Sequence, residues 1–211
     1  MRNGIDRAVL FDLDGTLLDS YATHYIAYER MFAHFGIAID RARFARSYFP
    51  DWQSTYRAFG LAEDLWKSAN VVWREENARH EAPLRDACTG VIDGLLPQWR
   101  VGLVSSGSRA RVLADLQRTG LDARMEVVIT GEDVVERKPS PEGILQALDK
   151  LGVAANRAIY IGDTPIDQQT ARAANVRFVG IRSDYATLDA EPMLSALSDL
   201  PDVLGRALQP A

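Results

Sequence analysis

Cysteine is nearly absent from this chain of 211 residues, with Cys88 its single thiol. One cysteine cannot form an internal disulfide, and such sparing use is typical of proteins from a reducing compartment. No catalytic partner for it is evident in the sequence, so Cys88 is predicted to be a small core residue rather than a nucleophile. Internal repeats and low-complexity stretches are absent as well.

The chain also lacks long apolar runs and an excess of positive charge. No run of 18 apolar residues occurs, and the first seven residues lack the apolar segment of a signal peptide, so a cytoplasmic protein is predicted. The formal net charge of −5 argues against nucleic acid or an anionic membrane as the main partner. Local charges would have to attract any anionic substrate. A monomer is expected, with a weak homodimer as the alternative.

The pattern of apolar residues predicts an α/β fold. Strand-like runs and helical patterns alternate regularly from residue 100 to residue 182, which is typical of βαβ units. Ser140 is predicted to cap a helix that begins at Pro141. We therefore expect a Rossmann-like, doubly wound parallel sheet covered on both sides. Its predicted strands are residues 101–104, 126–129, 158–161 and 177–181, and its predicted helices are residues 109–119, 141–151 and 166–174.

Residues 19–83 differ from the rest and are predicted to form a helical cap domain inserted after the first strand. A second helical pattern within them runs from Leu61 to Glu76, and no strand pattern appears. The aromatic residues are interpreted as the domain's own core, with a cofactor site as the alternative. Residues 1–18 and 84–211 would form the catalytic core. Five aromatic residues recur at helical spacings of three and four: Tyr21, Tyr25, Tyr28, Phe32 and Phe35.

Two carboxylates follow the first predicted strand. Asp12 and Asp14 come directly after Val9-Leu10-Phe11, a run that is typical of a strand buried on both faces. Ligands of open α/β sheets bind at the carboxyl ends of the strands, and Gly15 allows a sharp turn there. Two crowded carboxylates require a cation or a shared proton. A calcium loop is the alternative, but it requires a helix rather than a buried strand before it.

Three further strand ends carry polar groups. Ser105-Ser106-Gly107 offers a hydroxyl and backbone amides that suit an anion, with a plain helix cap as the alternative. Lys138 is one of three lysines among 24 basic residues, and a compact ammonium suits a crowded oxyanion, with a solvated lysine as the alternative. Asp163 ends another strand and Asp167 follows one helical turn later. Such carboxylates suit Mg²⁺, and all these groups are expected at one edge of the sheet.

Taken in this order, the motifs resemble those of the haloacid dehalogenase-like superfamily of phosphotransferases. The similarity extends over the whole chain, through residues 12–16, Ser105, Lys138-Pro139 and residues 162–167. The insert resembles the type 1 cap of this family, and the short stretch between Lys138 and Asp163 leaves no room for a second cap. Members similar to phosphoglycolate phosphatase and β-phosphoglucomutase form the branch that the chain resembles.

The resemblance implies roles for residues around a phosphoryl group. Asp12 would attack phosphorus and form an aspartyl-phosphate, and Asp14 would protonate the leaving alcohol and then activate water. Ser105, the Ser106 amide and Lys138 would hold the phosphoryl oxygens. A general acid alone contributes about 10²–10⁴-fold, so hydrolysis of a phosphate ester needs the whole set.

The resemblance also implies Mg²⁺ as the cofactor. Asp12, Asp163 and the backbone carbonyl of Asp14 would hold the ion, and Asp167 would steady its water ligands. Besides Ser106, the expected contacts with the substrate are assigned to Thr16, Gly107 and His24.

The activity expected from the resemblance is hydrolysis of a small phosphorylated metabolite. Dehalogenases of the family lack an acid at the position of Asp14, which argues against carbon–halogen hydrolysis. A sugar-phosphate mutase is the alternative, because His24 falls where such mutases carry a histidine; a surface or hinge histidine is the other interpretation. The phosphate-gripping Gly-x-Ser/Thr-Arg sequence of mutases is missing, and Arg46-Ser47-Tyr48-Phe49 stands near its place. A non-catalytic phospho-ligand-binding protein would have lost a catalytic or metal-binding residue, and none is missing.

Overall fold

The computed structural model of the protein describes residues 4–47, 52–184 and 187–207. Tyr48 and Phe49, which entered the comparison with mutases, lie outside the described residues. The core is a six-stranded sheet in the order β3-β2-β1-β4-β5-β6, and all its neighbouring strands are parallel. The strands are β1 (Ala8–Phe11), β2 (Arg100–Val104), β3 (Val127–Ile129), β4 (Ala158–Gly162), β5 (Arg177–Ile181) and β6 (Met193–Leu194). The strand order reverses between β1 and β4, which confirms the predicted doubly wound, Rossmann-like fold.

Strand β1 shows why the sheet is buried on both faces. Val9 and Phe11 belong to one apolar layer, whereas Ala8 and Leu10 belong to the other. All four side chains are fully buried. Successive side chains of a strand point to opposite faces, so a strand that has helices on both sides must be apolar throughout.

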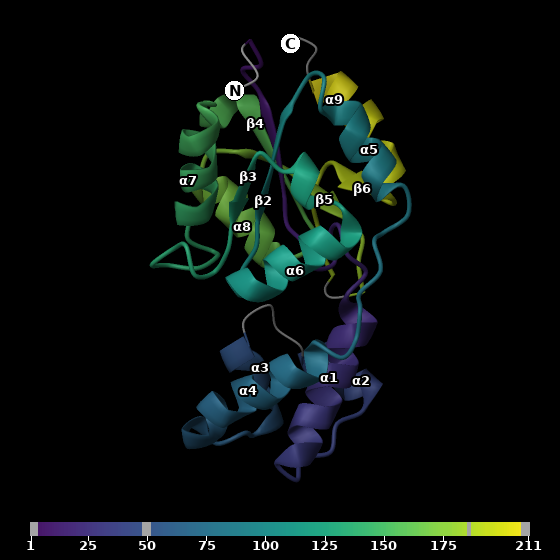
Figure 1. Ribbon diagram of the computed structural model, residues 1–211, viewed down its shortest axis with the longest axis vertical. Coiled ribbons are helices and arrows are strands. Elements are labelled where there is room, and N and C mark those ends of the chain that lie inside the picture. The colour runs from purple at the N-terminus through teal and green to yellow at the C-terminus, as the bar shows by residue number, and fades with distance from the viewer. Residues whose placement is uncertain (1–3, 48–51, 185–186, 208–211) are drawn as a thin grey trace.

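Helices cover both faces of the sheet, as Figure 1 shows. On one face lie α7 (Glu142–Leu151) and α8 (Pro165–Ala173), and on the other lie α5 (Cys88–Leu95), α6 (Arg109–Thr119) and α9 (Leu200–Ala207). Cys88 is buried in the second of these layers, so its prediction as a core residue is confirmed. Short 3₁₀ turns complete the elements: η1 (Glu63–Leu65), η2 (Asp122–Arg124), η3 (Ala155–Arg157) and η4 (Leu197–Asp199).

The start of α7 differs from the prediction by one residue. The helix begins at Glu142, and Pro141 rather than Ser140 occupies the capping position. The Ser140 hydroxyl still accepts a long hydrogen bond of 3.4 Å from the Glu142 N–H. The Glu142 carboxylate in turn accepts from the N–H groups of Val135 and Glu136 at 3.0 and 2.8 Å. This acid therefore anchors the loop before the helix, which the expected cap at Ser140 did not anticipate.

Between β1 and α5 the chain forms a separate helical unit, which lies below the sheet in Figure 1. It consists of α1 (Tyr21–His34), α2 (Arg41–Ser47), α3 (Trp52–Phe59) and α4 (Trp66–Asn77). The predicted aromatic stripe packs into the unit's own interior, with Tyr21 and Phe35 partly buried at its edge. The buried residues of this interior are Tyr25, Tyr28, Met31, Phe32, Phe44, Tyr56, Phe59, Leu61 and Ala69.

Two adjacent linkers join the helical unit to the core. Leu18 on the outgoing linker forms an antiparallel bridge with Leu84 on the returning one. The Asp19 N–H donates to the Pro83 carbonyl at 2.9 Å. The chain therefore leaves and re-enters the core at one place.

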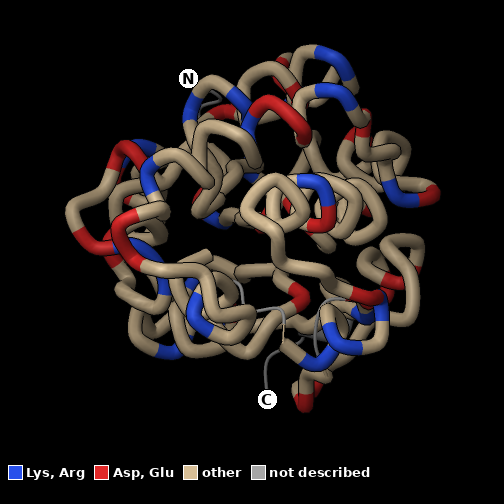
Figure 2. Tube along the Cα trace, turned by 90° about the horizontal axis from the view of Figure 1, so that it is seen from below, with Lys and Arg blue, Asp and Glu red and all other residues tan. Residues whose placement is uncertain are grey.

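The surface carries charges of both signs. In Figure 2, which views the protein from the side of the helical unit, basic and acidic residues are interspersed around the outline. Within the described part of the chain, no helix has the length and apolar character needed to cross a membrane.

Candidate active site

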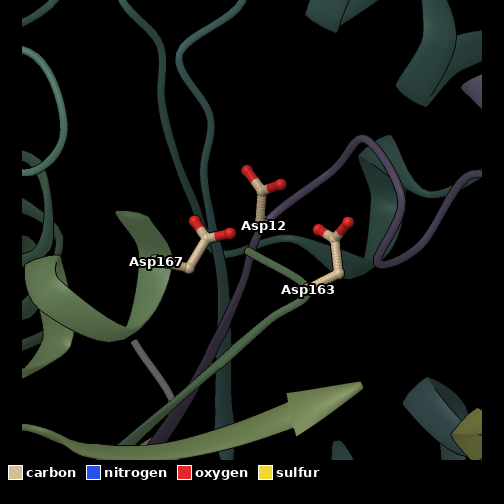
Figure 3. A group of neighbouring side chains, drawn as sticks. All are labelled: Asp12, Asp163 and Asp167. Carbon is tan, nitrogen blue, oxygen red and sulfur yellow. The ribbon is translucent and has the colours of Figure 1, made fainter. Parts of the chain in front are cut away.

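Three carboxyl groups meet at the carboxyl ends of β1 and β4. Asp12 directly follows β1, Asp163 follows β4, and Asp167 lies in the first turn of α8. One carboxylate oxygen of each lies within 4.8 Å of the others, and all three residues are buried. Figure 3 shows their carboxyl groups turned to the same side. The fold thus brings three carboxylates that were predicted from the sequence to the point where the strand order reverses.

This carboxylate cluster is electrostatically unfavourable by itself. Burial raises the pKa of Asp12, Lys138 opposes that increase, and Asp167 and Asp14 add to it. Burial also raises the pKa of Asp163 well above its usual range, and the charges of Asp167 and Asp12 raise it further. A divalent cation would relieve this repulsion, and crowded carboxylate oxygens are the ligands that Mg²⁺ prefers. The donor set therefore fits Mg²⁺.

Lys138 lies buried between two of these carboxylates. Its Nζ donates to Asp12 Oδ1 and to Asp167 Oδ1, both at 2.7 Å, and to the Tyr160 hydroxyl at 2.9 Å. Although burial lowers the pKa of Lys138, Asp12 and Asp167 raise it well above its usual range, so the ammonium stays charged. Tyr160 was missed from the sequence, because a tyrosine within an apolar strand is typical of a core aromatic residue.

Asp167 is surrounded by donors. Its Oδ2 accepts from the Thr164 N–H and hydroxyl at 3.1 and 2.6 Å, in a capping box that begins α8. Its Oδ1 faces Lys138 and lies 3.1 Å from the Tyr160 hydroxyl. A Cβ at Gly162 would overlap the Asp167 Cβ, so a glycine is needed for this close approach. A carboxylate has about four acceptor positions, so this geometry favours a role in holding Lys138 over direct binding of a metal.

Asp163 is held by two hydroxyl groups. Thr16 donates to its Oδ1 at 3.0 Å, and Ser183 donates to its Oδ2 at 2.6 Å. Thr16 is fully buried and its hydroxyl orients Asp163, and its expected contact with substrate stays a prediction. Ser183 was missed, because a single serine shortly after a strand is typical of an ordinary loop residue.

Asp14 is held by two basic side chains. Arg111 of α6 donates to both of its carboxylate oxygens, at 3.1 and 2.5 Å, and His24 Nε2 lies 3.5 Å from Oδ1. Burial raises the pKa of Asp14, but the charges of Arg111 and His24 lower it by more. The pKa therefore lies below the usual range of an aspartate. Burial lowers the pKa of His24 to about 4, so this histidine is neutral near pH 7.

Arg111 is a site residue that sequence reasoning missed. It lies against the predicted phosphate cradle, residues 105–107, because a Cβ on Gly107 would overlap one of its guanidinium nitrogens. Within that cradle, the Gly107 N–H donates to Ser105 Oγ at 3.1 Å. Arg111 thus lies between the cradle and Asp14. The 97 residues that separate it from Asp14 leave no local motif that could have revealed the pair.

A cavity of 590 Å³ lies between the core and the helical unit, and the residues that line it include Asp12, Asp14, Arg111, Lys138 and Asp167. This volume suits a small-molecule ligand. His24 is 5% exposed and packs edge-on against Trp73, so it is a residue of the cavity wall and not a surface histidine. The helical unit contributes to the wall His24, Tyr28, Trp52, Gln53, Tyr56, Asn70, Trp73 and Arg74. The core contributes Asp12, Asp14, residues 105–108, Arg111, Glu132, Val135, Arg137, Lys138, Thr164, Ile166 and Asp167.

Comparisons with known proteins agree with this architecture. The haloacid dehalogenase-like hydrolase family is matched by residues 9–181 of the chain. Pyrophosphatase PpaX of Bacillus pumilus is 29% identical, and the match covers 97% of this chain and 99% of that protein. Validoxylamine A 7'-phosphate phosphatase of Streptomyces hygroscopicus subsp. limoneus is 32% identical over 93% of this chain and 95% of its own.

A solved structure from Lactobacillus plantarum, described as a candidate phosphoglycolate phosphatase, superposes with a TM-score of 0.84 and 26% identity. The superposition covers 93% of this chain and 98% of that one. The chain belongs to the haloacid dehalogenase-like hydrolase family. The expected enzyme class, a phosphatase-type hydrolase, is thereby confirmed at the level of the class, whereas the substrates named for the relatives belong to those proteins.

Proposed function

We propose that this protein is a Mg²⁺-dependent phosphatase that hydrolyses a small phosphomonoester through an aspartyl-phosphate. One observation carries the proposal: Asp12 is buried at the end of β1, paired with Lys138, and lines the cavity. A nucleophile needs a fixed position, and the developing phosphoryl charge needs a fixed cation. Lys138 meets both needs, because it holds one oxygen of Asp12 and keeps its charge.

The reaction would proceed in two displacements at phosphorus. Asp12 forms a bond to phosphorus while the bond to the leaving oxygen breaks, and Asp14 supplies the proton that the leaving alcohol gains. Asp14 then accepts a proton from the water that attacks the aspartyl-phosphate, which releases inorganic phosphate and restores Asp12. Because Arg111 keeps Asp14 ionised, proton donation requires this ion pair to open.

Asp12, Asp163 and the backbone carbonyl of Asp14 would hold Mg²⁺, which when bound supplies positive charge against the phosphoryl oxygens. Ser105, the Ser106 amide and Gly107 would bind these oxygens on the other side. Their place at the end of β2, on the cavity wall, supports this role.

We further propose that residues 19–83 act as a cap that selects the substrate. The helical unit provides a wall of aromatic, amide and basic side chains opposite the carboxylates. Two relatives are named for unlike substrates, a pyrophosphate and a validoxylamine phosphate, although both match this chain over nearly its full length. A shared core with a variable wall accounts for this diversity.

The experiment that tests the mechanism uses Asp12→Asn, which keeps the size of the side chain and removes the nucleophilic carboxylate. The variant is expected to show no turnover of an aryl phosphate above background, while its circular dichroism and melting temperature remain near wild type. Rapid acid quenching should reveal a phosphoryl group on wild-type enzyme and none on the variant. Near-normal turnover by folded Asp12→Asn would exclude Asp12 as the nucleophile.

A sugar-phosphate mutase is the second candidate, and the place of His24 favours it. This histidine contacts Asp14 from the cavity wall, where a group that moves with the cap could assist transfer to a second hydroxyl. Incubation with a hexose 1-phosphate and a hexose bisphosphate distinguishes the two activities. Release of inorganic phosphate supports the phosphatase, whereas conversion to the 6-phosphate with little release supports the mutase.

A further inference from the structure

Arg85 lies on the linker that returns from the helical unit, and its side chain joins two loops of the core. One guanidinium nitrogen donates to the Gly15 carbonyl at 2.5 Å, and another donates to the Arg182 carbonyl at 2.6 Å. The backbone N–H of Arg85 donates to the Leu17 carbonyl at 2.9 Å, and this bond anchors Arg85 to the neighbouring linker. Arg85 does not line the cavity, so its contacts serve the protein rather than a ligand.

Both carbonyls that Arg85 holds are directly bonded to residues that hold Asp163. The Gly15 carbonyl belongs to the peptide unit that continues into Thr16, and the Arg182 carbonyl belongs to the unit that continues into Ser183. A peptide unit is planar, so fixing its oxygen also fixes the direction in which the next Cα lies. The hydroxyls of Thr16 and Ser183 then meet the two oxygens of Asp163 from opposite loops.

We propose that Arg85 is a positioning residue of the metal site, which acts on Asp163 through Thr16 and Ser183. This inference rests on the proposed function, because it takes Asp163 as a ligand of Mg²⁺. A guanidinium suits the task, since its planar fork presents separate donors to two carbonyls, whereas an ammonium is a single point of charge. Such outer contacts set the orientation of a metal-binding carboxylate.

The test compares the Mn²⁺ affinity of substrate-free protein variants. Free Mn²⁺ is measured by electron paramagnetic resonance during titration of metal-free enzyme. Arg85→Met removes both donors and keeps an apolar stem, and it is expected to raise the dissociation constant about 10-fold, the lower end for loss of an outer contact. Arg85→Lys should give a smaller increase. The Mg²⁺ concentration for half-maximal turnover should rise in parallel, with an unchanged KM at saturating Mg²⁺.

Arg157→Met is the matched control. Arg157 also joins separate parts of the chain, because it donates to the Asp6 carbonyl at 3.2 Å and pairs with the Asp6 carboxylate at 2.6 Å. It lies at the opposite ends of β1 and β4, away from the carboxylates. Its loss should leave Mn²⁺ binding within about twofold of wild type. An equal weakening in Arg157→Met would overturn the proposal, because it would indicate a general loss of stability.

Wild-type affinity in folded Arg85→Met would likewise overturn it. If Arg85→Met fails to fold, Arg85→Lys combined with Ser183→Ala decides the matter. The two changes should weaken binding by less than the product of their separate effects, because they share the route through Ser183. If the double variant weakens Mn²⁺ binding by the full product of the two separate effects, the two residues act independently and the proposal is overturned.

Failure of the proposed function has a different signature. In that case wild-type protein would bind no Mn²⁺, or Asp163→Ala would leave its binding unchanged, and the role of Arg85 would be overturned with the metal site. If Asp163→Ala abolishes binding and Arg85→Met leaves it intact, the metal site stands and only the role of Arg85 is refuted.

Discussion

The core and the helical unit differ in whether the same residues form the buried interior and line the cavity. In the core, apolar and mostly aliphatic side chains on the strands form the interior, and separate residues after the strand ends face the cavity. In the helical unit, Tyr28 and Tyr56 belong both to the buried interior and to the cavity wall. A substitution in the core can therefore remove chemistry and spare the fold. A substitution of an aromatic residue in the helical unit changes both stability and the shape of the site.

The largest effect is expected at the carboxylates of the core. Asp163→Ala should reduce turnover on the order of 10³-fold at moderate Mg²⁺, because a bound metal contributes several kcal/mol to phosphoryl transfer. Asp167→Ala should instead lower kcat at saturating Mg²⁺, since Asp167 holds Lys138. Titrating the rate with Mg²⁺ separates the two.

Removing the metal from the wild-type protein tests the same carboxylates without a substitution. A chelator should abolish activity, added Mg²⁺ should restore it, and Ca²⁺ should substitute badly because its larger and looser coordination misplaces the phosphoryl group. Full activity after exhaustive chelation would break the assignment of chemistry to these carboxylates.

The interior of the helical unit should control stability. Phe32 is fully buried and is not among the residues that line the cavity, so Phe32→Ala should lower the free energy of unfolding by about 3–5 kcal/mol without changing KM at low temperature. Tryptophan fluorescence reports on this region, because Trp52, Trp66 and Trp73 lie in it and Trp99 alone lies in the core.

Tyr28→Ala sharpens the same comparison. It should lower the melting temperature and also change KM, because Tyr28 is shared between the interior and the wall. If Phe32→Ala changed KM as much as Tyr28→Ala does, the distinction between interior and wall residues would be wrong.

His24 tests whether the helical unit takes part in chemistry. His24→Ala should lower turnover of an alkyl phosphate about 10-fold, less than the loss of a general acid itself, because His24 contacts Asp14 and is not the proton donor. Turnover of an aryl phosphate should fall less, since that leaving group needs less help from a proton donor. The control is His34→Ala, an exposed residue at the end of the same helix. Equal losses on both substrates would indicate a role in positioning the cap instead.

The smallest effect is expected for the single thiol of the core. Burial raises the pKa of Cys88 to about 12, so at pH 8 the group is a protonated thiol enclosed in an apolar layer. Iodoacetamide should leave folded protein unmodified and fully active, and it should react once denaturant is added. Rapid modification of the native enzyme would show that this layer opens more readily than its packing indicates.

The sequence predicted the core well because each of its elements packs on a sheet with a fixed period. Helix α6 has the predicted ends, and the other core elements that were predicted differ by one residue at most at either end, whereas α5 and α9 were not predicted. Strand β6 was missed because it has two residues and no helix before it. Helix α2 was missed because Phe44 alone is buried among its seven residues, which is too little for a helical period.

The sequence predicted those residues of the candidate site that the order of strands alone brings to one edge of the sheet. Asp12, Lys138 and Asp163 follow strands of one parallel sheet, so their meeting required no knowledge of side-chain directions. Thr16 and Arg111 depend on those directions: the first turns toward Asp163 and the second reaches Asp14 from another element. Hydrogen bonds between residues far apart in sequence leave no local pattern.

The pairing of the two linkers also bears on how such enzymes diversify. Leu18 and Leu84 already lie within bridging distance, so the core is interrupted at one point and its two chain ends there need no rearrangement to be joined. A two-residue Asn-Gly turn suits such an antiparallel junction. The helical unit can therefore be exchanged as a whole. Another set of helices inserted at this junction would form a new cavity wall opposite the same carboxylates and lysine. Substrate range can then evolve by exchange of a whole segment, without repeated point changes around the carboxylates.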